Sequence, residues 1–236
     1  MKHLHRVPIS FKARTELARA RSEISNAEDA RAMWGRIRQR RVFDEVCSAL
    51  AATCGKRQRC MYCCDSRSCD IDHFEPLASA PARALDYRNF LWICADCNRH
   101  KGDRFSGHLI DPTRTDPWRH FVFIEQSGEI APRWIDEDTE DPQARSTVDI
   151  IPTLCHESVT EGRLDAYSRL KVSAVRLLED SGSLERHAEM AFELRANEFG
   201  LARWVTAYEG RRAQPWSTLW SNTAIKSRRL AALASQ

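Results

Sequence analysis

Two Cys-x-x-Cys pairs, separated by 30 residues, constrain the fold of this chain more than any other feature. The pairs are Cys60/Cys63 and Cys94/Cys97. A Cys-x-x-Cys turn presents two sulfurs to one ion, and structural zinc sites take four such ligands in a tetrahedron. We therefore expect one zinc ion to bind all four thiols, with a folded segment between the two turns.

Two alternatives to this ligand set remain open. Cys64 or Cys69 could replace Cys63, although only Cys60 and Cys63 repeat the two-residue gap of the later pair, and the thiols could also be buried without metal. The chain has nine cysteines and its first residues contain no apolar signal segment, so we expect reduced thiols in the cytoplasm. The cysteines outside the zinc site are expected to be packing residues: Cys47, Cys54, Cys64, Cys69 and Cys155.

An Asp-His pair lies between the two cysteine pairs. Residues 69–74 contain Asp72 and His73 and are followed by Pro76, a pattern that predicts a short strand. Neighbouring side chains on a regular strand point to opposite faces, so both residues could serve one phosphate only if the strand bends or bulges here. The alternative is a satisfied polar pair in the core.

A returning strand and a helix complete this region. Residues 87–93 (YRNFLWI) predict the returning strand, with Asn89 inside it. Residues 95–104 predict a helix that begins at the second cysteine pair. On that helix Asn98 and Lys101 are three positions apart and share one face.

These residues resemble the signature of the HNH, or ββα-metal, nuclease family in three places: Asp72-His73, Asn89, and the run CADCNRHK that ends at Lys101. The resemblance implies that His73 is the general base that activates water. It implies that Asp72 and Asn98 hold one divalent metal. It also implies that Asn89 fixes the loop and the His73 ring, which makes these four residues the expected catalytic set.

The chemistry of the side chains agrees with these roles. An imidazole has an unperturbed pKa of about 6.5 and can accept a proton near neutral pH. The oxygen atoms of Asp72 and Asn98 suit Mg²⁺ or Mn²⁺, which complete their shells with water and phosphate oxygens. The third signature position is Asn98 here, and His100, two residues later, is the alternative occupant.

Basic residues flank the central region. Residues 1–41 contain eleven Lys or Arg and four acids, and residues 211–230 contain five bases and no acid. Phosphate contacts supply most non-specific affinity for nucleic acid, so basic flanks fit a nucleic-acid partner. The expected contacts are Lys101, Arg36, Arg40 and Arg41; the alternative for each arginine is a solvated helix face.

Helical spacing dominates the N-terminal part of the chain. Residues 11–25 predict one helix, and a second begins after the cap residue Asn26. A change in the apolar phase predicts a break near Arg40. Trp34 lies in the apolar stripe of the second helix, so we expect it in the core and not as a platform for stacking bases.

The remainder of the chain predicts a hairpin and then helices. Residues 120–134 alternate around a glycine turn, and an acidic linker (DEDTED) follows at 136–141. From Ser158 the pattern is helical, with a second helix after Ser183 and shorter helices up to Leu233.

Several longer stretches of sequence indicate a particular group within the HNH family. DHFEP, YRNFLWIC, CNRHKGD and LIDPTRTDPWRHFVF are similar to the HNH component of retron-associated and Septu-type antiphage systems. This similarity implies a role in antiviral defence beside an ATPase partner. Trp204, Trp216 and Trp220 would then either anchor that interface or pack in a helical core.

Together these patterns predict an α+β protein, with a zinc-ribbon-stapled ββα-metal HNH core and helical regions on both sides. We expect a basic helical arm at 1–55, the nuclease core at 56–112, a hairpin and acidic linker at 113–157, and a helical region at 158–236. The expected function is metal-dependent hydrolysis of phosphodiester bonds in DNA. An RNase, for example on transfer RNA, and a non-catalytic zinc-ribbon module that binds nucleic acid are the alternatives. No stretch reaches the length of a membrane span, so we expect no membrane association.

Overall fold

The computed structural model describes residues 1–68 and 70–226, and its contacts divide the chain into two units. The cysteine-centre unit contains His3–Thr115 and Pro142–Thr153. The helical unit contains Met1–Lys2, Asp116–Asp141 and the residues from Leu154 onward. The basic arm and the central region, which the sequence suggested as separate segments, therefore lie in one unit.

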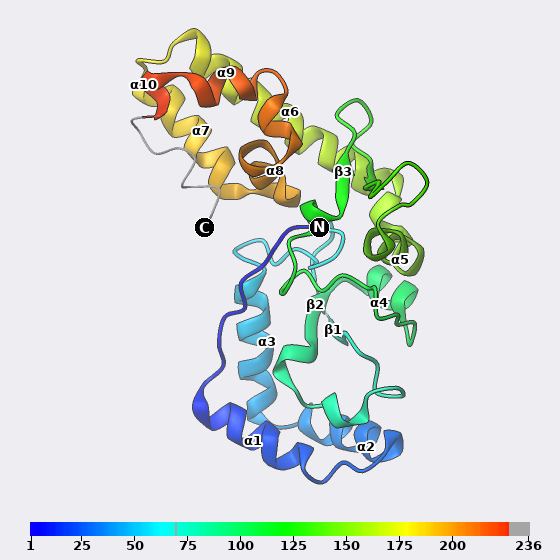
Figure 1. Cartoon of the computed structure of the whole chain (residues 1–236). Coiled ribbons are helices and arrows are strands. Elements are labelled where there is room, and N and C mark those ends of the chain that lie inside the picture. The colour runs from blue at the N-terminus through cyan, green and yellow to red at the C-terminus, as the bar shows by residue number, and fades with distance from the viewer. Residues whose placement is uncertain (69, 227–236) are drawn as a thin grey trace. The chain divides into compact units, whose positions relative to one another are not determined.

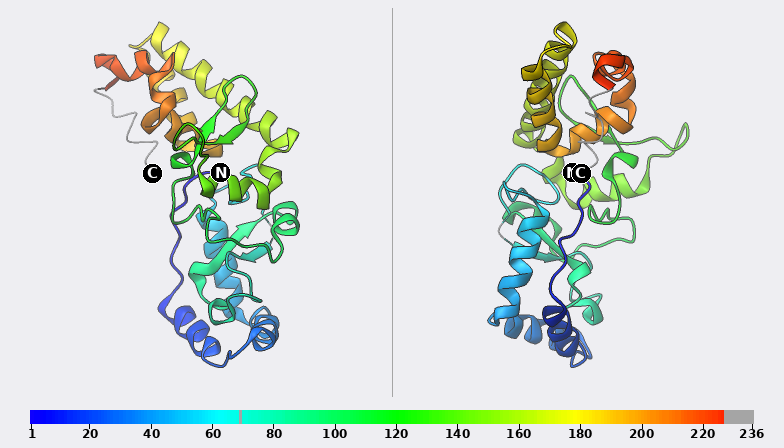
Figure 2. Two further views of the ribbon diagram at one scale, coloured as in Figure 1. Left: turned by 45° about the vertical axis from the view of Figure 1, so that its right-hand side comes forward. Right: turned by 90° about the vertical axis from the view of Figure 1, so that its left-hand side faces the viewer.

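Three helices begin the cysteine-centre unit: α1 (Phe11–Arg21), α2 (Ala27–Ile37) and α3 (Arg41–Thr53). Asn26 caps α2 as expected, because its side chain accepts hydrogen bonds from two backbone N–H groups of the first turn. The break near Arg40 is confirmed, since that residue precedes the first turn of α3. In Figures 1 and 2, α1 and α2 lie at one end of α3.

A two-stranded antiparallel sheet packs beside α3. Strand β1 (Asp70–His73) pairs with β2 (Phe90–Ile93). The helix α3 contacts β2 and buries an apolar face that includes Val46 and Leu50. The helix α4 (Ala95–Lys101) follows β2 and ends at Gly102, whose φ of 48° favours glycine. The predicted helix therefore ends three residues earlier than expected.

One expectation about these strands is wrong, and the condition stated for Asp72 and His73 to share one side of β1 is not met. Asn89 is not inside the returning strand, because Tyr87–Asn89 form a short 3-10 helix, capped by Asp86, before β2 begins. The strand β1 has no bulge, since each of its residues from Asp70 to His73 pairs with one residue of β2. Neighbouring side chains at its end consequently point to opposite faces.

The helix α5 (Pro142–Ile150) returns to the cysteine-centre unit and was not predicted from the sequence. The backbone N–H of Ile110 donates to Thr147 Oγ1 at 3.0 Å, and Arg104 Nη2 donates to the carbonyl of Ile150 at 2.8 Å. These contacts join the residues that follow α4 to a helix that lies about forty positions later in the sequence.

The helical unit contains the predicted hairpin and the C-terminal helices. The hairpin pairs β3 (Phe121–Phe123) with β4 (Ile130–Pro132). The helices are α6 (Glu157–Glu179), α7 (Leu184–Ala196), α8 (Leu201–Ala207), α9 (Trp216–Ser221) and α10 (Thr223–Lys226). The end point expected at Leu233 lies outside the described residues. Short 3-10 helices connect several elements: Pro81–Arg83, Pro117–Arg119, Pro152–Cys155, Glu198–Gly200 and Glu209–Arg212.

Aromatic side chains form the core of the helical unit. Trp204, Trp216 and Trp220 are all buried, with at most 9% of each residue exposed. The proposal that they anchor an interface is therefore wrong, and they are core residues. Among the described helices, none is both long enough and apolar enough to cross a membrane.

Candidate active site

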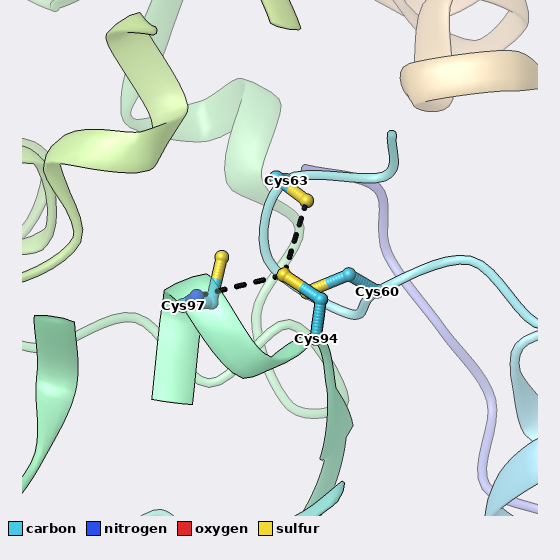
Figure 3. A group of neighbouring side chains, drawn as sticks. All are labelled: Cys60, Cys63, Cys94 and Cys97. Carbon is cyan, nitrogen blue, oxygen red and sulfur yellow. Dashed lines mark hydrogen bonds between the residues drawn. The ribbon is translucent and has the colours of Figure 1, made fainter. Parts of the chain in front are cut away.

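The four predicted zinc ligands come from one loop and one helix start. Cys60 and Cys63 lie in a turn that is fixed to the sheet, because the N–H of Met61 donates to the carbonyl of Trp92 at 3.0 Å. Cys94 is the N-cap of α4, and its sulfur accepts the N–H of Cys97 at 3.5 Å. Figure 3 shows the two pairs facing each other.

The geometry of this cysteine centre fits a zinc ion. The four sulfurs lie within 4.8 Å of one another and all four residues are buried. The sulfurs of Cys63 and Cys94 are 3.8 Å apart. Four sulfurs at about 2.3 Å from zinc in a tetrahedron are separated by about 3.8 Å, so the observed spacing needs little adjustment. The cluster could therefore hold zinc.

The other cysteines separate into different environments. Cys64 is buried but lies outside the cluster, while Cys69 lies outside the described residues. Cys54 is buried and Cys47 is half-buried, as packing residues would be. Cys155 is exposed, so the expectation that it packs in the core is wrong.

Strand β1 and helix α4 are joined by two polar pairs on one face of the strand. Lys101 Nζ donates to Asp72 Oδ1 at 3.1 Å, and Asn98 Nδ2 donates to Asp70 Oδ2 at 3.1 Å. The pairs follow from the two periodicities, because residues two apart on a strand and three apart on a helix each share a face. The structure therefore brings Asp72 and Asn98 to the same side of β1.

Asp72 is buried and incompletely paired. Lys101 Nζ lies 3.0 Å from Asp72 Oδ2, but that oxygen has no hydrogen bond. Burial raises the pKa of Asp72 to about 6, and the Lys101 ammonium opposes this shift. The Lys101 ammonium is the charge partner of this oxygen, but the oxygen accepts no hydrogen bond and keeps its lone pairs for a second cation. This oxygen is therefore a suitable ligand atom for a metal.

Asn98 offers its amide oxygen because its nitrogen is occupied. The hydrogen bond from Nδ2 to Asp70 fixes the orientation of the amide, since a carboxylate only accepts. The amide oxygen makes no hydrogen bond within the described residues. A carboxylate oxygen from Asp72 and an amide oxygen from Asn98 are the hard ligands that a divalent cation such as Mg²⁺ prefers.

His73 lies on the opposite face of the strand, in a largely apolar environment. Its ring packs edge-on against Trp34 and Phe90, with centroid distances of 4.5 and 5.2 Å. Nε2 lies 2.8 Å from the carbonyl oxygen of Ala84, so Nε2 carries the proton and Nδ1 keeps its lone pair. Burial lowers the pKa of His73 to about 4, which leaves the ring neutral at pH 7.

Asn89 holds the loop that supplies this carbonyl. Its Nδ2 donates to the carbonyls of Glu75 at 3.0 Å and Arg83 at 3.2 Å, and its Oδ1 accepts the N–H of Glu75 at 2.9 Å. Asn89 is fully buried, so these bonds replace the water that the amide loses on folding. The residue after Arg83 is Ala84, the partner of the His73 ring.

The remaining predicted residues lie further from this arrangement. His100 is exposed and its Nδ1 is 2.8 Å from Thr153 Oγ1, whereas Asn98 faces β1. Lys101 is fully buried, so its ammonium contacts Asp72 and does not reach the surface. Arg36 and Arg41 are exposed, and Arg40 lies 3.7 Å from Glu16.

Three contributors were not identified from the sequence. Asp70 orients Asn98, and strand alternation from Asp72 could have indicated it. The Ala84 carbonyl is a backbone group without a sequence signal. Arg6 donates to the carbonyls of Arg88 and Phe90 at 3.1 and 2.6 Å, more than eighty positions away, and no local pattern predicts such a contact.

The part of the chain that contains both cysteine pairs matches the model of a known protein family. The HNH endonuclease family model matches residues 58–104. The match spans both cysteine pairs, β1, β2 and α4, and it supports a nuclease that acts on nucleic acid. HNH nucleases use divalent metals, and the side-chain oxygens of Asp72 and Asn98 beside α4 are of the type that such metals prefer. A search of curated proteins finds no match to the chain.

Proposed function

We propose that this chain is an endonuclease that hydrolyses phosphodiester bonds in DNA, with His73 as the general base. The observation that carries the proposal is the hydrogen bond of 2.8 Å between His73 Nε2 and the Ala84 carbonyl, within the HNH-matched region. This hydrogen bond places the ring proton on Nε2, which leaves Nδ1 as the basic atom of a neutral ring. Among the described residues, no hydrogen-bond partner occupies Nδ1.

The proposed reaction uses this lone pair. Because His73 is the last residue of β1 and its side chain points away from that of Asp72, the reaction requires the scissile phosphate to lie beyond the end of the strand, where groups from both faces can reach it. Nδ1 accepts a proton from water as the water oxygen attacks phosphorus, and the bond from phosphorus to the leaving oxygen breaks. The Ala84 carbonyl stabilises the imidazolium that forms, because it accepts the N–H that the positive charge polarises. A general base of this kind contributes about 10² to 10⁴-fold to rate.

Asp72 and Asn98 would hold the catalytic Mg²⁺ or Mn²⁺. When bound, such an ion neutralises charge on the phosphate and stabilises the leaving oxygen. Asp70 keeps the amide oxygen of Asn98 available by accepting its N–H. Lys101 keeps the buried carboxylate of Asp72 ionised, which is the form that a cation binds.

Asn89 is a positioning residue in this proposal. Its hydrogen bonds go to the loop and not to the His73 ring, and they fix the backbone at both ends of the segment from Glu75 to Arg83. The loop then presents the Ala84 carbonyl at the distance that selects the tautomer of His73. Arg36, Arg40 and Arg41 would contribute phosphate contacts from the α2–α3 junction.

Parallel digestion of plasmid DNA and total RNA tests the substrate class. We expect Mg²⁺-dependent cleavage of DNA that stops when Mg²⁺ is omitted and returns when it is added. Cleavage of RNA alone would replace DNA with RNA as substrate, because the base and metal chemistry does not read the sugar. Binding without cleavage of either polymer would favour a non-catalytic zinc module.

The antiphage assignment is a further part of the proposal. It is supported by the similarity of the longer stretches to HNH components of retron-associated and Septu-type systems, and it implies an ATPase partner. Expression of the chain with its genomic neighbours should protect cells against phage, and His73→Ala should remove that protection. Equal protection by the variant would show that defence against phage does not depend on the nuclease activity of this chain.

A further inference from the structure

A pocket in the cysteine-centre unit lies between α1 and the segment that joins Ala84 to Asn89. It encloses about 380 Å³. Its apolar lining includes the buried side chains of Ile9, Leu17 and Leu85. Pockets that bind small molecules enclose about 300 to 1,000 Å³, so this one is large enough for a nucleotide.

Three exposed arginines line the pocket: Arg14 and Arg21 on α1, and Arg88 on the joining segment. Their guanidinium groups make no ion pair or hydrogen bond within residues 1–68 and 70–226. The one carboxylate of the lining, Asp86, already accepts hydrogen bonds from Arg83 Nη2 and from the N–H of Arg88. The lining is therefore basic, with three cations free to bind an anion.

A fourth arginine fixes one wall of the pocket. Arg6 Nη1 donates to the carbonyl of Phe90 at 2.6 Å, and Nη2 donates to the carbonyl of Arg88 at 3.1 Å. Tyr87 Oη donates to the carbonyl of Val7 at 2.7 Å. The N-terminal segment and the joining segment are consequently bonded to each other, and the pocket is formed before any ligand arrives.

We propose that this pocket binds a nucleotide, with the phosphate on the arginines and the base against the apolar lining. One guanidinium group can donate two parallel hydrogen bonds to the oxygens of a phosphate. Arginine and tyrosine side chains also stack on bases. The nucleotide could belong to the strand that is cleaved, a source that rests on the proposed function, or it could be a free nucleotide.

Binding of a nucleotide in the pocket would affect the candidate active site through the backbone segment from Ala84 to Asn89. Leu85 and Arg88 line the pocket, whereas Ala84 and Asn89, at either end of that segment, hold the His73 ring and its loop. A bound phosphate that pairs with Arg88 would restrict this segment. The ligand would thereby stabilise the hydrogen bond that selects the base.

Charge reversal on α1 tests the proposal. The zinc-loaded full chain is titrated without Mg²⁺ or Mn²⁺ with two probes, adenosine 5′-monophosphate and a short fluorescent single-stranded oligodeoxynucleotide. The variants are Arg14→Glu and Arg21→Glu. The matched control is Arg19→Glu, which makes the same charge change in the last turn of α1 at an exposed residue outside the pocket. Circular dichroism and zinc content establish that each variant is folded.

Each pocket variant should weaken binding of one or both probes about tenfold more than the control does, as expected for loss of a charged hydrogen bond. A selective effect on the monophosphate identifies a free nucleotide, and a selective effect on the oligonucleotide identifies the strand. Equal effects of all three substitutions, or no binding of either probe, would overturn the proposal. Cleavage by the wild-type chain under Mg²⁺ would then still support the proposed function.

Discussion

His73 and Asp72 are adjacent in sequence, yet burial shifts their proton affinities in opposite directions. The pKa of His73 falls to about 4 and that of Asp72 rises to about 6, because burial disfavours the charged form of each. At neutral pH the histidine is uncharged and can accept a proton, while the aspartate is ionised and can bind a cation. The same physical cause therefore prepares two different functions.

These shifts predict how stability depends on pH without added Mg²⁺. Between about pH 4 and 6.5 the unfolded chain binds a proton at His73 that the folded chain does not, so acidification destabilises the fold by up to about 3 kcal/mol. Between about pH 4 and 6 the folded chain binds a proton at Asp72 that the unfolded chain does not, so acidification stabilises it by a similar amount, about 3 kcal/mol.

The two contributions nearly cancel in the wild-type chain, and single substitutions should separate them. His73→Gln should become more stable as pH falls from 6 to 4, relative to wild type, and Asp72→Asn should become less stable. Urea unfolding at several pH values measures both slopes. Parallel curves for the three proteins would contradict the assigned shifts.

Residue types with strong chemical preferences could be predicted from sequence, but their partners could not. The cysteine spacing identified the four cysteines that the structure brings into one cluster, Cys60 and Cys63 with the later pair. The signature also located His73, but not the Ala84 carbonyl that determines its tautomer. Lys101 was expected on the surface, because spacing alone does not show that a carboxylate faces it inside the fold.

At the scale of elements, the cysteine centre fixes a loop to the start of α4. Both β1 and α4 are short, at four and seven residues, so they bury little apolar surface of their own. A structural zinc ion contributes about 10 to 16 kcal/mol of apparent binding free energy in small modules. The arrangement of β1, β2 and α4 should therefore depend on the metal.

Cys97→Ser should remove zinc and unfold this region. The reason is that loss of one thiolate leaves an incomplete site whose other ligands are buried. Zinc content and circular dichroism check the result, and Cys64→Ser, at a buried cysteine outside the cluster, is the matched control. Native structure with one zinc per chain in Cys97→Ser would show that the ligand set is wrong.

The proposed Mg²⁺ site should respond to different residues from the cysteine centre. Asp72→Ala and Asn98→Ala should raise the Mg²⁺ concentration needed for half-maximal cleavage by about tenfold or more, because each removes one of the two oxygen atoms proposed to bind the ion. Zinc content should stay unchanged in both. His100→Ala is the control, since this exposed side chain contacts Thr153 instead of β1. Loss of zinc from either variant would mean that the two metal sites had been confused.

Elements with regular apolar spacing were predicted well, and short irregular ones were not. The N-terminal helices, the hairpin and α6 follow their patterns because burial of one face determines each. Tyr87–Asn89 was predicted as strand because its sequence is β-prone. It forms a 3-10 helix instead, because the Asp86 cap and the hydrogen bonds of Asn89 override that preference. The strand β1 is regular despite its polar end, because β2 pairs with it throughout.

At the scale of the whole molecule, the family match covers less than the unit that contains it. The cysteine-centre unit includes α5, which lies outside residues 58–104 and follows an excursion into the helical unit. The bonds from Ile110 to Thr147 and from Arg104 to Ile150 depend on that return. Sequence patterns did not indicate it, because a single amphipathic helix does not show which core it joins.

This arrangement predicts the minimal stable unit. A chain truncated after Thr115 should unfold at a lower temperature than one truncated after Thr153, although both retain the HNH-matched residues. A buried N–H left without an acceptor costs about 1 to 3 kcal/mol, and Ile110 would be one such group. Thr147→Val in the longer chain removes that acceptor, together with the hydrogen bond that Thr147 Oγ1 donates to the carbonyl of Gln143 within α5. Equal melting temperatures would show that α5 does not support the unit.

Plasmid cleavage by His73→Ala tests the central claim most directly. The variant should retain zinc, fold and DNA binding, and its cleavage rate with saturating Mg²⁺ should fall by about 10² to 10⁴-fold, because the general base is removed. The matched variant His100→Ala should cleave at the wild-type rate, since its ring lies on the surface beside Thr153. Wild-type cleavage by His73→Ala, or loss of activity in His100→Ala alone, would contradict the assignment of His73 as the base.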